Sequence, residues 1–375
     1  MGKNSKIEWT DHTFNPWRGC QEVHTGCDNC YARTLARRNP AVLGVWGPNG
    51  TRVVASEAQW RQPLKWDREA AADGVRRRVF CASLADVFED WRGPMVDSAG
   101  RTLYVHDCQP SPEPDRYVAM SADGPGALLE IERDNIEPGM VRLLTLDDVR
   151  VRLFWLIDAT PNLDWIYVTK RPENVRRMWP KNGFPDAGVP GTLGKHRHFP
   201  NVWLLTSISD QKTADAMVPE LLKCRDLCPV LGVSAEPLLG PVDLGEAIKC
   251  RCSESISECQ YCDMCLDSVL DWVIIGGESG PDARCCDVEW IRDLVSQCKT
   301  ACVPAFVKQL GSRQSTRLPD GERWPGHTGP VSPVQFCGDG FGNFSVLGLT
   351  DRKGGDPTEW PVGLRVRQFP EVRNA

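Results

Sequence analysis

The sequence has few histidines, no long apolar run and no strong net charge. Its 375 residues include only 6 histidines, and only the pair His196 and His198 has a spacing that suggests shared ligands. A run of about eighteen apolar residues, which a helical membrane span requires, is missing. The polar first twenty residues lack the apolar core of a signal peptide. We therefore expect a cytoplasmic protein without a membrane partner. The net charge of −6 gives no reason for non-specific nucleic-acid binding.

Cysteine, by contrast, is abundant. Seventeen cysteines without an export signal indicate a reducing compartment and metal binding rather than a disulfide framework. Cys20, Cys27 and Cys30 follow one another at spacings of six and two intervening residues. Three thiolates, rather than four, leave one position of a metal centre open, and thiolates suit iron–sulfur clusters. We favour a cluster at these three cysteines. The alternatives are a zinc loop with a distant fourth ligand and three unrelated buried thiols.

A second group of cysteines lies in an apparent insertion late in the chain. It contains two overlapping Cys-x-x-Cys pairs and one Cys-x-Cys, formed by Cys250, Cys252, Cys259, Cys262 and Cys265. This spacing predicts metal binding, either of zinc or of an auxiliary iron–sulfur cluster. Further ligands are conceivable at Cys285, Cys286, Cys298 and Cys302, although single cysteines are more often small core residues.

Short apolar strands alternate with helical segments along much of the chain. A strand is predicted to open the segment 78–88, which ends in small and acidic residues. Further strands are predicted at residues 164–169, 201–206, 229–235, 271–275 and 303–307, and helices at 31–39, 147–159, 173–178, 213–224 and 288–300. This alternation indicates the α/β class with a parallel sheet covered on both faces. We expect a full or partial (β/α) barrel, with an open doubly wound sheet as the alternative.

Changes in composition along the chain predict its domain organisation. A barrel core with an N-terminal cluster loop is expected over residues 1–89 and 146–311. A β-rich lobe is inserted at 90–145, a cysteine-rich metal knuckle at 246–268, and a C-terminal cap with a last short strand follows at 312–375.

Polar residues stand where the predicted strands end. Catalytic groups collect at the carboxyl ends of barrel strands, so we expect these side chains to share one site: Ser83, Asp86, Lys170, Arg171, Ser207, Ser209, Asp210, Glu236, Glu278, Lys308 and Gln309. The best candidate for a carboxylate or phosphate clamp is Lys170 with Arg171. Glu236 and Glu278 are candidates for binding a hydroxyl or an amine. Gly276 and Gly277 have no side chains, so the backbone there can approach a cofactor closely. The alternative is that they simply form a tight turn.

Five motifs of the chain together resemble a known family. They are NSKIEWTDHTFNPWRGC with GCDNCYA, VTKRPENV, SAEPLLGPV, DWVIIGGESGPDAR and GDPTEWPVGLRVRQFP. They are similar to the phage gp thirty-seven/gp sixty-eight family, whose members look like radical S-adenosylmethionine enzymes of unestablished substrate. The resemblance covers most of residues 1–89 and 146–375, and it places a phage-encoded chain in the host cytoplasm.

The resemblance implies a radical-SAM type barrel and a 4Fe-4S cluster held by Cys20, Cys27 and Cys30. S-adenosylmethionine would bind the cluster and, after one-electron reduction by an electron donor protein, yield a 5′-deoxyadenosyl radical. Two features depart from the common radical-enzyme pattern. The cysteine spacing there is three then two residues, and the Gly-Gly-Glu element there follows an early strand rather than a late one.

Three hypotheses of function follow. The first is a radical S-adenosylmethionine enzyme with a nucleotide or nucleic acid as candidate substrate. The second is a non-catalytic, nucleic-acid-associated binding protein stabilised by zinc or a cluster. The third, a metal-dependent hydrolase or transferase, is disfavoured because the chain lacks a His/Asp cluster to hold zinc or magnesium.

Overall fold

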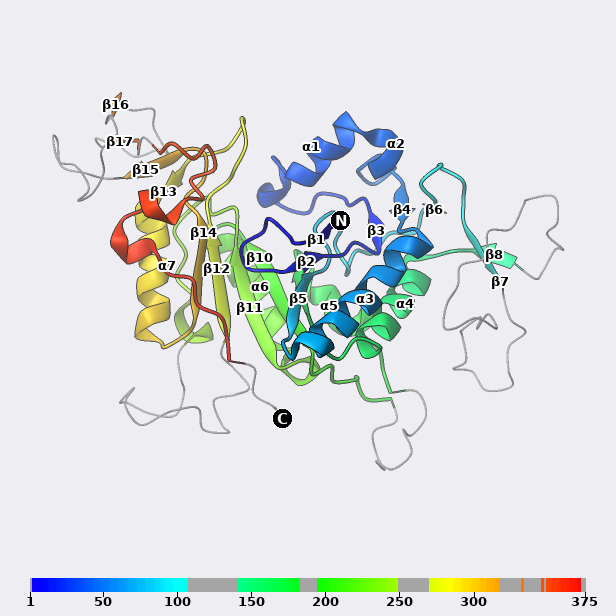
Figure 1. Ribbon diagram of the computed structural model, residues 1–375. Coiled ribbons are helices and arrows are strands. Elements are labelled where there is room, and N and C mark those ends of the chain that lie inside the picture. The colour runs from blue at the N-terminus through cyan, green and yellow to red at the C-terminus, as the bar shows by residue number, and fades with distance from the viewer. Residues whose placement is uncertain are drawn as a thin grey trace. The chain divides into compact units, whose positions relative to one another are not determined.

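A computed structural model describes residues 2–106, 141–182, 194–248, 270–316, 332–333, 345–346 and 349–371 (Figure 1). The chain divides into two compact units. The first contains Met1–Glu22, Tyr31–Tyr167 and Asn174–Val202, and the second contains Val23–Cys30, Val168–Glu173 and Trp203–Ala375. No helix in the described ranges is long and apolar enough to cross a membrane.

The first unit contains a mixed sheet with the strand order β1-β2-β5-β9. Its strands are β1 (Gly2–Lys3), β2 (His12–Thr13), β5 (Arg77–Phe80) and β9 (Leu163–Thr169), the last two residues of which belong to the second unit. β1 pairs antiparallel with β2, and the pairs β2–β5 and β5–β9 are parallel. The sheet is therefore mostly parallel, as the alternating pattern of strands and helices predicts.

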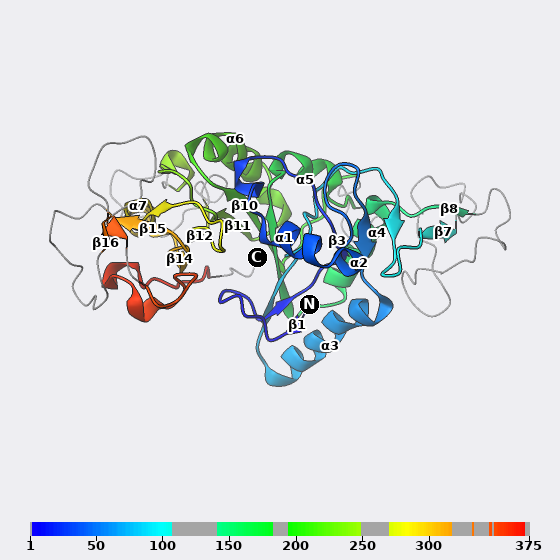
Figure 2. The ribbon, with the colours of Figure 1, turned by 90° about the horizontal axis from the view of Figure 1, so that it is seen from above.

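Two smaller sets of strands complete the first unit. β3 (Trp17–Arg18), β4 (Arg52–Val54) and β6 (Met95–Val96) form a three-stranded sheet. β7 (Tyr104–His106) and β8 (Val141–Leu143) form an antiparallel pair, visible in Figure 2.

Of the five helices described in the first unit, two begin at capping boxes. The five are α1 (Tyr31–Arg38), α2 (Pro40–Leu43), α3 (Glu57–Asp73), α4 (Leu146–Asp158) and α5 (Pro172–Met178), which starts in the second unit. Ser56 and Gln59 form a capping box at the start of α3, and Thr145 and Asp148 form one at the start of α4. Such reciprocal bonds satisfy backbone N–H groups that a helix leaves unpaired.

Aromatic side chains form much of the first unit's core. The ring of Phe154 on α4 contacts those of Tyr167, Trp179 and Phe199, and Phe88 packs against Tyr167 and Trp179. All five are buried. Aromatic pairs of this kind contribute stability beyond the area that they bury.

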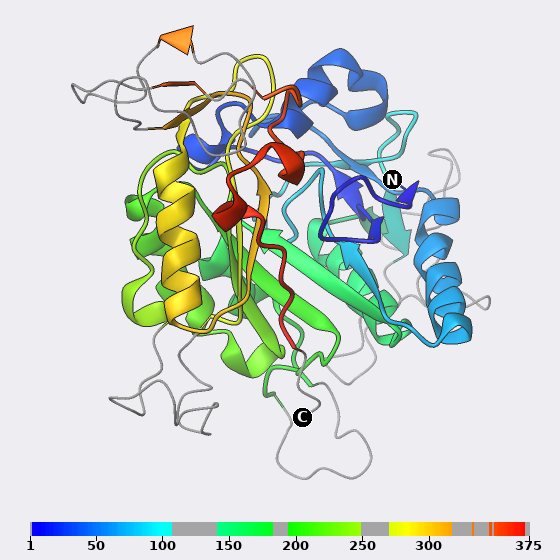
Figure 3. The ribbon, with the colours of Figure 1, turned by 60° about the vertical axis from the view of Figure 1, so that its left-hand side comes forward.

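The second unit contains four parallel strands in the order β10-β11-β12-β14. They are β10 (Val202–Ile208), β11 (Val230–Ala235), β12 (Trp272–Gly276) and β14 (Ala305–Gln309). Nearly all their residues are buried, as a parallel sheet covered by helices requires. The covering helices are α6 (Gln211–Leu222) and α7 (Val288–Thr300); Figure 3 shows α7 alongside β12 and β14.

A small second sheet and the C-terminal tail complete the second unit. The sheet has the order β13-β15-β17-β16, formed by β13 (Cys286–Asp287), β15 (Gln314–Thr316), β17 (Ser345–Val346) and β16 (Ser332–Pro333). The tail lies along the edge of β14, where the N–H of Val307 donates to the carbonyl of Val366 at 2.8 Å. The N–H of Gln368 donates to Ala305 at 2.9 Å.

The structure confirms a mixed α/β fold rich in parallel strands, and corrects several boundaries. The strand expected to open the segment 78–88 ends at Phe80, and the last strand begins at Ala305 rather than at 303. Pro40 begins α2 instead of simply ending α1, since proline suits the first position of a helix. The expected terminal strand at 364–369 is only a single bridge between Phe306 and Arg367. The predicted domain boundaries stay a prediction.

In the first unit, Arg52 and Glu89 form a buried ion pair next to Gln21, the residue that follows Cys20. Nε and Nη2 of Arg52 donate to the carboxylate of Glu89 at 2.7 and 2.8 Å, and both side chains are 0% exposed. The same carboxylate accepts from the backbone N–H of Gln21 at 2.9 Å. The guanidinium lies over the ring of Trp91, 4.5 Å from its centroid. The pair therefore fixes the backbone beside Cys20.

Replacing Glu89 by Gln should destabilise the protein strongly, because it leaves the Arg52 charge buried without its counter-ion. We expect a loss of about 3–5 kcal/mol in the free energy of unfolding. Urea unfolding measures it, with Glu220→Gln as control because Glu220 pairs with Lys223 on the surface. A loss no larger than the control's would contradict this account of the pair.

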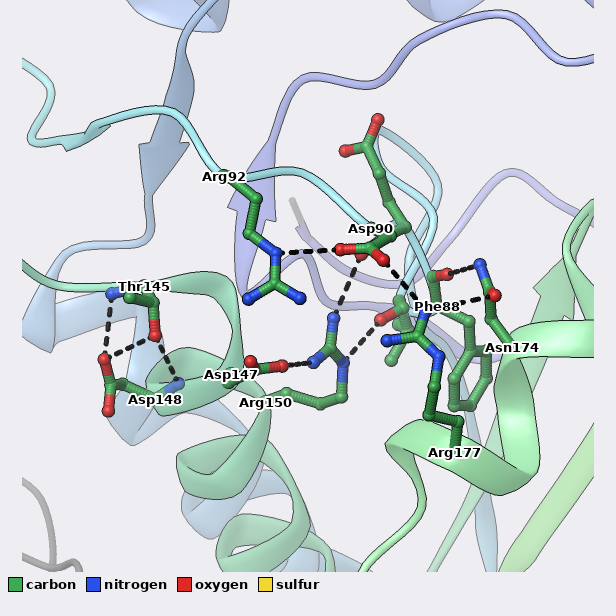
Figure 4. Close-up of polar contacts among 11 residues, drawn as sticks. Phe88, Asp90, Arg92, Thr145, Asp147, Asp148, Arg150, Asn174 and Arg177 are labelled. Carbon is green, nitrogen blue, oxygen red and sulfur yellow. Dashed lines mark hydrogen bonds and ion pairs between the residues drawn. The ribbon is translucent and has the colours of Figure 1, made fainter.

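A second arginine anchors the segment that contains Glu89. Nε of Arg150 donates to the carbonyl of Val87 at 2.9 Å, and its Nη2 donates to that of Glu89 at 3.1 Å. Figure 4 shows this guanidinium between Asp147 and the segment. From α5, Asn174 donates to the carbonyl of Phe88 at 3.0 Å. The segment that supplies Glu89 is thus held from two helices of one unit.

Asp148, in the capping box of α4, should make stability depend on pH. Burial alone would raise the pKa of Asp148, but hydrogen bonds from Arg142 and Thr145 outweigh it and hold this pKa below its ordinary value of 3.8. The ionised form therefore stabilises the fold above about pH 4, and this stabilisation is lost as pH falls through the folded-state pKa.

We expect Asp148→Asn to lower the free energy of unfolding by about 1 kcal/mol at pH 7, and by progressively less below pH 4. Urea unfolding at several pH values measures the difference, with Asp73→Asn, at an exposed pair with Arg77, as control. A difference that persists unchanged to pH 3 would count against the carboxylate's role.

Candidate functional site

A chain of polar contacts connects the ends of β9, β10 and β11 within the second unit. Nζ of Lys170, just after β9, donates to Oγ of Ser207 at 2.9 Å. The Ser207 hydroxyl donates to the carbonyl of Glu236, just after β11, at 3.0 Å. These residues were predicted to converge because each follows or ends a strand, and the structure brings all three together.

The side chain of Glu236 extends the cluster to β14. Its carboxylate forms an ion pair with Lys308 and lies 3.5 Å from Nε2 of Gln309. The two members of the ion pair are 19% and 20% exposed, so both are partly accessible to solvent. Gln309 also donates to the carbonyl of Gly277 at 2.8 Å. A carboxylate and two lysines therefore gather where four strands end.

Gly276, which ends β12, and Gly277, which follows it, have different roles. A Cβ at Gly277 would lie 2.3 Å from the carbonyl oxygen of Leu310, so glycine is needed there for packing. A Cβ at Gly276 would lie 3.5 Å from the carboxyl carbon of Glu236, at ordinary contact distance. The tight-turn interpretation accounts for Gly277. A Cβ at Gly276 would instead fit in van der Waals contact with Glu236 and Gln309.

Glu278 is engaged by protein donors. Its Oε2 accepts from the backbone N–H of Arg284 at 2.7 Å and from Asn29 at 3.1 Å, and its Oε1 accepts from Nη2 of Arg284 at 2.7 Å. Burial alone would raise the pKa of Glu278, but these bonds outweigh it and lower the pKa. The carboxylate is therefore held ionised and anchors Arg284 and Asn29. The sequence indicates Glu278 as a candidate for binding a hydroxyl or an amine and does not predict this role.

The anchor holds the segment Val23–Cys30, which contains two of the three predicted cluster cysteines. Nη1 of Arg284 donates to the carbonyl of Thr25 at 2.8 Å and to Asp28 at 3.0 Å, and Asn29 donates to the carbonyl of Asp282 at 2.8 Å. We call these contacts, with those to Glu278, the Arg284 latch.

The cysteines of the N-terminal motif are half-buried thiols outside any disulfide. Cys27 ends the short helix η1 (Thr25–Cys27), and the N–H of Cys30 donates to the carbonyl of Cys27 at 3.1 Å. Both belong to the second unit, and Cys20 belongs to the first. Within the described ranges, no three His, Cys, Asp or Glu side chains form a group that could hold a metal ion. The cluster stays a prediction.

The remaining predicted residues are distributed over both units. Ser83 and Asp86 lie in the first, where Ser83 accepts from Asn15 at 3.1 Å and Asp86 accepts from the N–H of Phe88 at 3.0 Å. In the second unit Arg171 is buried, and Asp210 caps α6. The knuckle cysteines lie outside the described residues: Cys250, Cys252, Cys259, Cys262 and Cys265.

Two of the later single cysteines, Cys286 and Cys298, are buried core residues. Burial raises the pKa of the Cys286 thiol well above its ordinary value and that of Cys298 to about 12. Cys302 is exposed, and Cys285 is disulfide-bonded, a bond that the prediction of free or metal-bound thiols did not anticipate.

The sequence does not single out His24, a polar residue in the segment Val23–Cys30. His24 accepts a hydrogen bond at Nδ1 from the N–H of Gly26 at 3.0 Å and thereby caps η1. Burial, reinforced by the charge of Lys170, lowers the pKa of His24 to about 4. The only signal in the sequence is its position three residues before Cys27.

Comparison with protein families shows that the chain belongs to DUF5131, a family of proteins of unknown function. The match covers residues 4–97 and 145–336. Comparison with curated proteins finds no significant match. Comparison with solved structures finds none either.

The latch gives a prediction about the mobility of the cysteine segment. Arg284→Lys keeps the charge but loses the planar fork that bonds Glu278 and Thr25 at once. We expect the amides of Cys27 and Cys30 to exchange hydrogen faster. The free energy of unfolding should fall by about 1–2 kcal/mol, a modest value because Arg284 is partly exposed.

Arg292→Lys on α7 is the matched control, since Arg292 pairs with Glu289 on the surface of the same unit. Amide exchange at Cys27 and Cys30 that is equal in both variants would show that the latch does not order the segment.

Proposed function

We propose that this protein is an iron–sulfur, S-adenosylmethionine-dependent radical enzyme with a nucleotide or nucleic acid as substrate. In this proposal Cys20, Cys27 and Cys30 hold a 4Fe-4S cluster, and the parallel strands are those of a full or partial (β/α) barrel of the radical-SAM type. The cysteine-rich insertion holds a second cluster or zinc, and an electron donor protein is a partner.

One observation carries the proposal. The Arg284 latch ties the segment with Cys27 and Cys30 to Glu278, directly after β12. In the same unit, Lys170, Glu236 and Lys308 gather at strand ends. Partly accessible thiols and a charged ligand site thus come from one compact unit, as an enzyme that activates a bound cofactor requires.

The donor atoms present suit the proposed cofactors. Thiolates are the ligands of iron–sulfur clusters, and Cys27 and Cys30 are reduced and partly accessible. When bound, the reduced cluster and S-adenosylmethionine supply reductive cleavage to a 5′-deoxyadenosyl radical.

The chain's own residues would bind and orient the cofactor and substrate. Lys170 and Arg171 supply positive charge for a carboxylate or phosphate. Glu236, held by Lys308, offers a carboxylate oxygen to an amine or hydroxyl. Ser207 positions Lys170.

The test is anaerobic purification and reconstitution with iron and sulfide, followed by counts of iron, acid-labile sulfide and zinc. Formation of 5′-deoxyadenosine is then assayed with S-adenosylmethionine and dithionite. We expect cluster-dependent product that falls to background in the double variant Cys27→Ala/Cys30→Ala. Cys302→Ser, at an exposed thiol of the same unit, serves as control.

Three outcomes are informative. Iron, sulfide and product that are lost only in the double variant support the proposal. Stoichiometric zinc without cleavage of S-adenosylmethionine overturns it in favour of a metal-stabilised, nucleic-acid-associated binding protein. A cluster that survives the double variant would assign the iron to other cysteines.

A further inference from the structure

Several buried polar atoms in the second unit have no partner in the described part of the chain, and two of them belong to residues that pack against Gly26. They are Nε2 of His24, in the cysteine segment, and Oγ of Ser209, which directly follows β10. Buried polar atoms are nearly always hydrogen-bonded, and one left unsatisfied costs about 1–3 kcal/mol. Two such atoms near one another therefore require an explanation.

Gly26 brings the two groups to the same place. A Cβ built on Gly26 would lie 2.3 Å from Oγ of Ser209, 2.7 Å from Cε1 of His24, the carbon between the two ring nitrogens, and 3.0 Å from its Nδ1. Only glycine permits this approach, so the backbone of the cysteine segment runs directly over the Ser209 hydroxyl. Ser209 itself is 0% exposed.

The protonation state of His24 determines whether its Nε2 can donate or accept a hydrogen bond. A backbone N–H can only donate, so Nδ1 accepts from Gly26 and the proton of the neutral ring is on Nε2. The lowered pKa keeps the ring neutral at pH 7. His24 therefore presents an N–H donor, and binding a metal at Nε2 would require giving up the bond to Gly26.

Charged groups of both signs lie around His24. Lys170 and Arg171 are the nearby cations, and Asp28 and Asp210 are the nearby anions. Both anions have partners of their own, since Asp28 pairs with Arg284 and Asp210 accepts from the N–H of Thr213 at 2.8 Å. Among these charges, that of Lys170 acts most strongly on His24, so a cation lies near the donors of His24 and Ser209.

We propose that His24 and Ser209, together with Lys170, bind an oxyanion, the carboxylate or phosphate group of a small ligand. An oxygen acceptor supplies the partner that each buried donor lacks. Entry requires a local displacement of the segment, in which Val23, Thr25 and Asp28 are exposed. The inference deepens the strand-end ligand site of the proposed function, but it needs neither a cluster nor S-adenosylmethionine.

The experiment titrates the full-length protein, without added cofactor, with sodium phosphate and in parallel with sodium acetate by isothermal titration calorimetry. We expect one of the two anions to bind measurably. Tighter binding of phosphate indicates a phosphorylated ligand such as a nucleotide, and tighter binding of acetate indicates a carboxylate ligand.

Two variants separate binding from folding. His24→Asn keeps an oxygen that accepts from Gly26 but removes the Nε2 donor, and Ser209→Ala removes the orphaned hydroxyl. Each should weaken anion binding by about tenfold or more. Ser209→Ala should leave the unfolding midpoint unchanged or raise it, because the hydroxyl has no partner to lose. Ser296→Ala, on the exposed face of α7, should change neither quantity.

Absence of binding of both anions to the wild-type protein would overturn the inference, as would binding unchanged in both variants. A marked loss of stability in Ser209→Ala would show that the hydroxyl has a structural partner instead. Anion binding combined with failure to cleave S-adenosylmethionine would keep this inference and reject the proposed radical chemistry.

Discussion

The organisation of the second unit depends on the carboxylate of Glu278. It accepts hydrogen bonds from the backbone and side chain of Arg284 and from Asn29, at positions separated by about 250 residues of sequence. Because a buried carboxylate needs several donors to stay ionised, these partners cannot leave singly without cost. This is why a loop from the start of the chain is ordered against a turn near its end.

In the first unit, another arginine–glutamate pair holds the backbone next to Cys20. There Glu89 accepts from Arg52 and from the N–H of Gln21, next to Cys20. Arg150 in turn fixes the backbone at Glu89. Each flank of the motif is thus held inside its own unit by an arginine–glutamate pair, and charge-assisted bonds give such pairs directional control of backbone position.

The sequence predicts the regular core well and the polar contacts poorly. The buried runs of β9 to β12 and the amphipathic helix α7 follow from local periodicity, which neighbouring residues determine. The two-residue strands β1 to β3 have no such period. α3 extends to Asp73 through Pro63, where proline would be expected to end it. Glu278 shows the wider limit of prediction from sequence. The fold brings Asn29 and Arg284 to it, and the spacing of these residues along the chain does not reveal this.

The comparison of sequence prediction with structure also distinguishes residues that stabilise the fold from residues that we propose bind a ligand. Strand-end position alone put Glu278 and Ser209 in one candidate set, yet the structure assigns them opposite states. Glu278 accepts hydrogen bonds from Asn29 and Arg284, whereas the Ser209 hydroxyl and Nε2 of His24 are buried without partners among the described residues. Folding alone gains nothing from an unsatisfied donor. A polar atom whose desolvation is not offset in the isolated chain is therefore a better guide to a binding site than charge or position at a strand end.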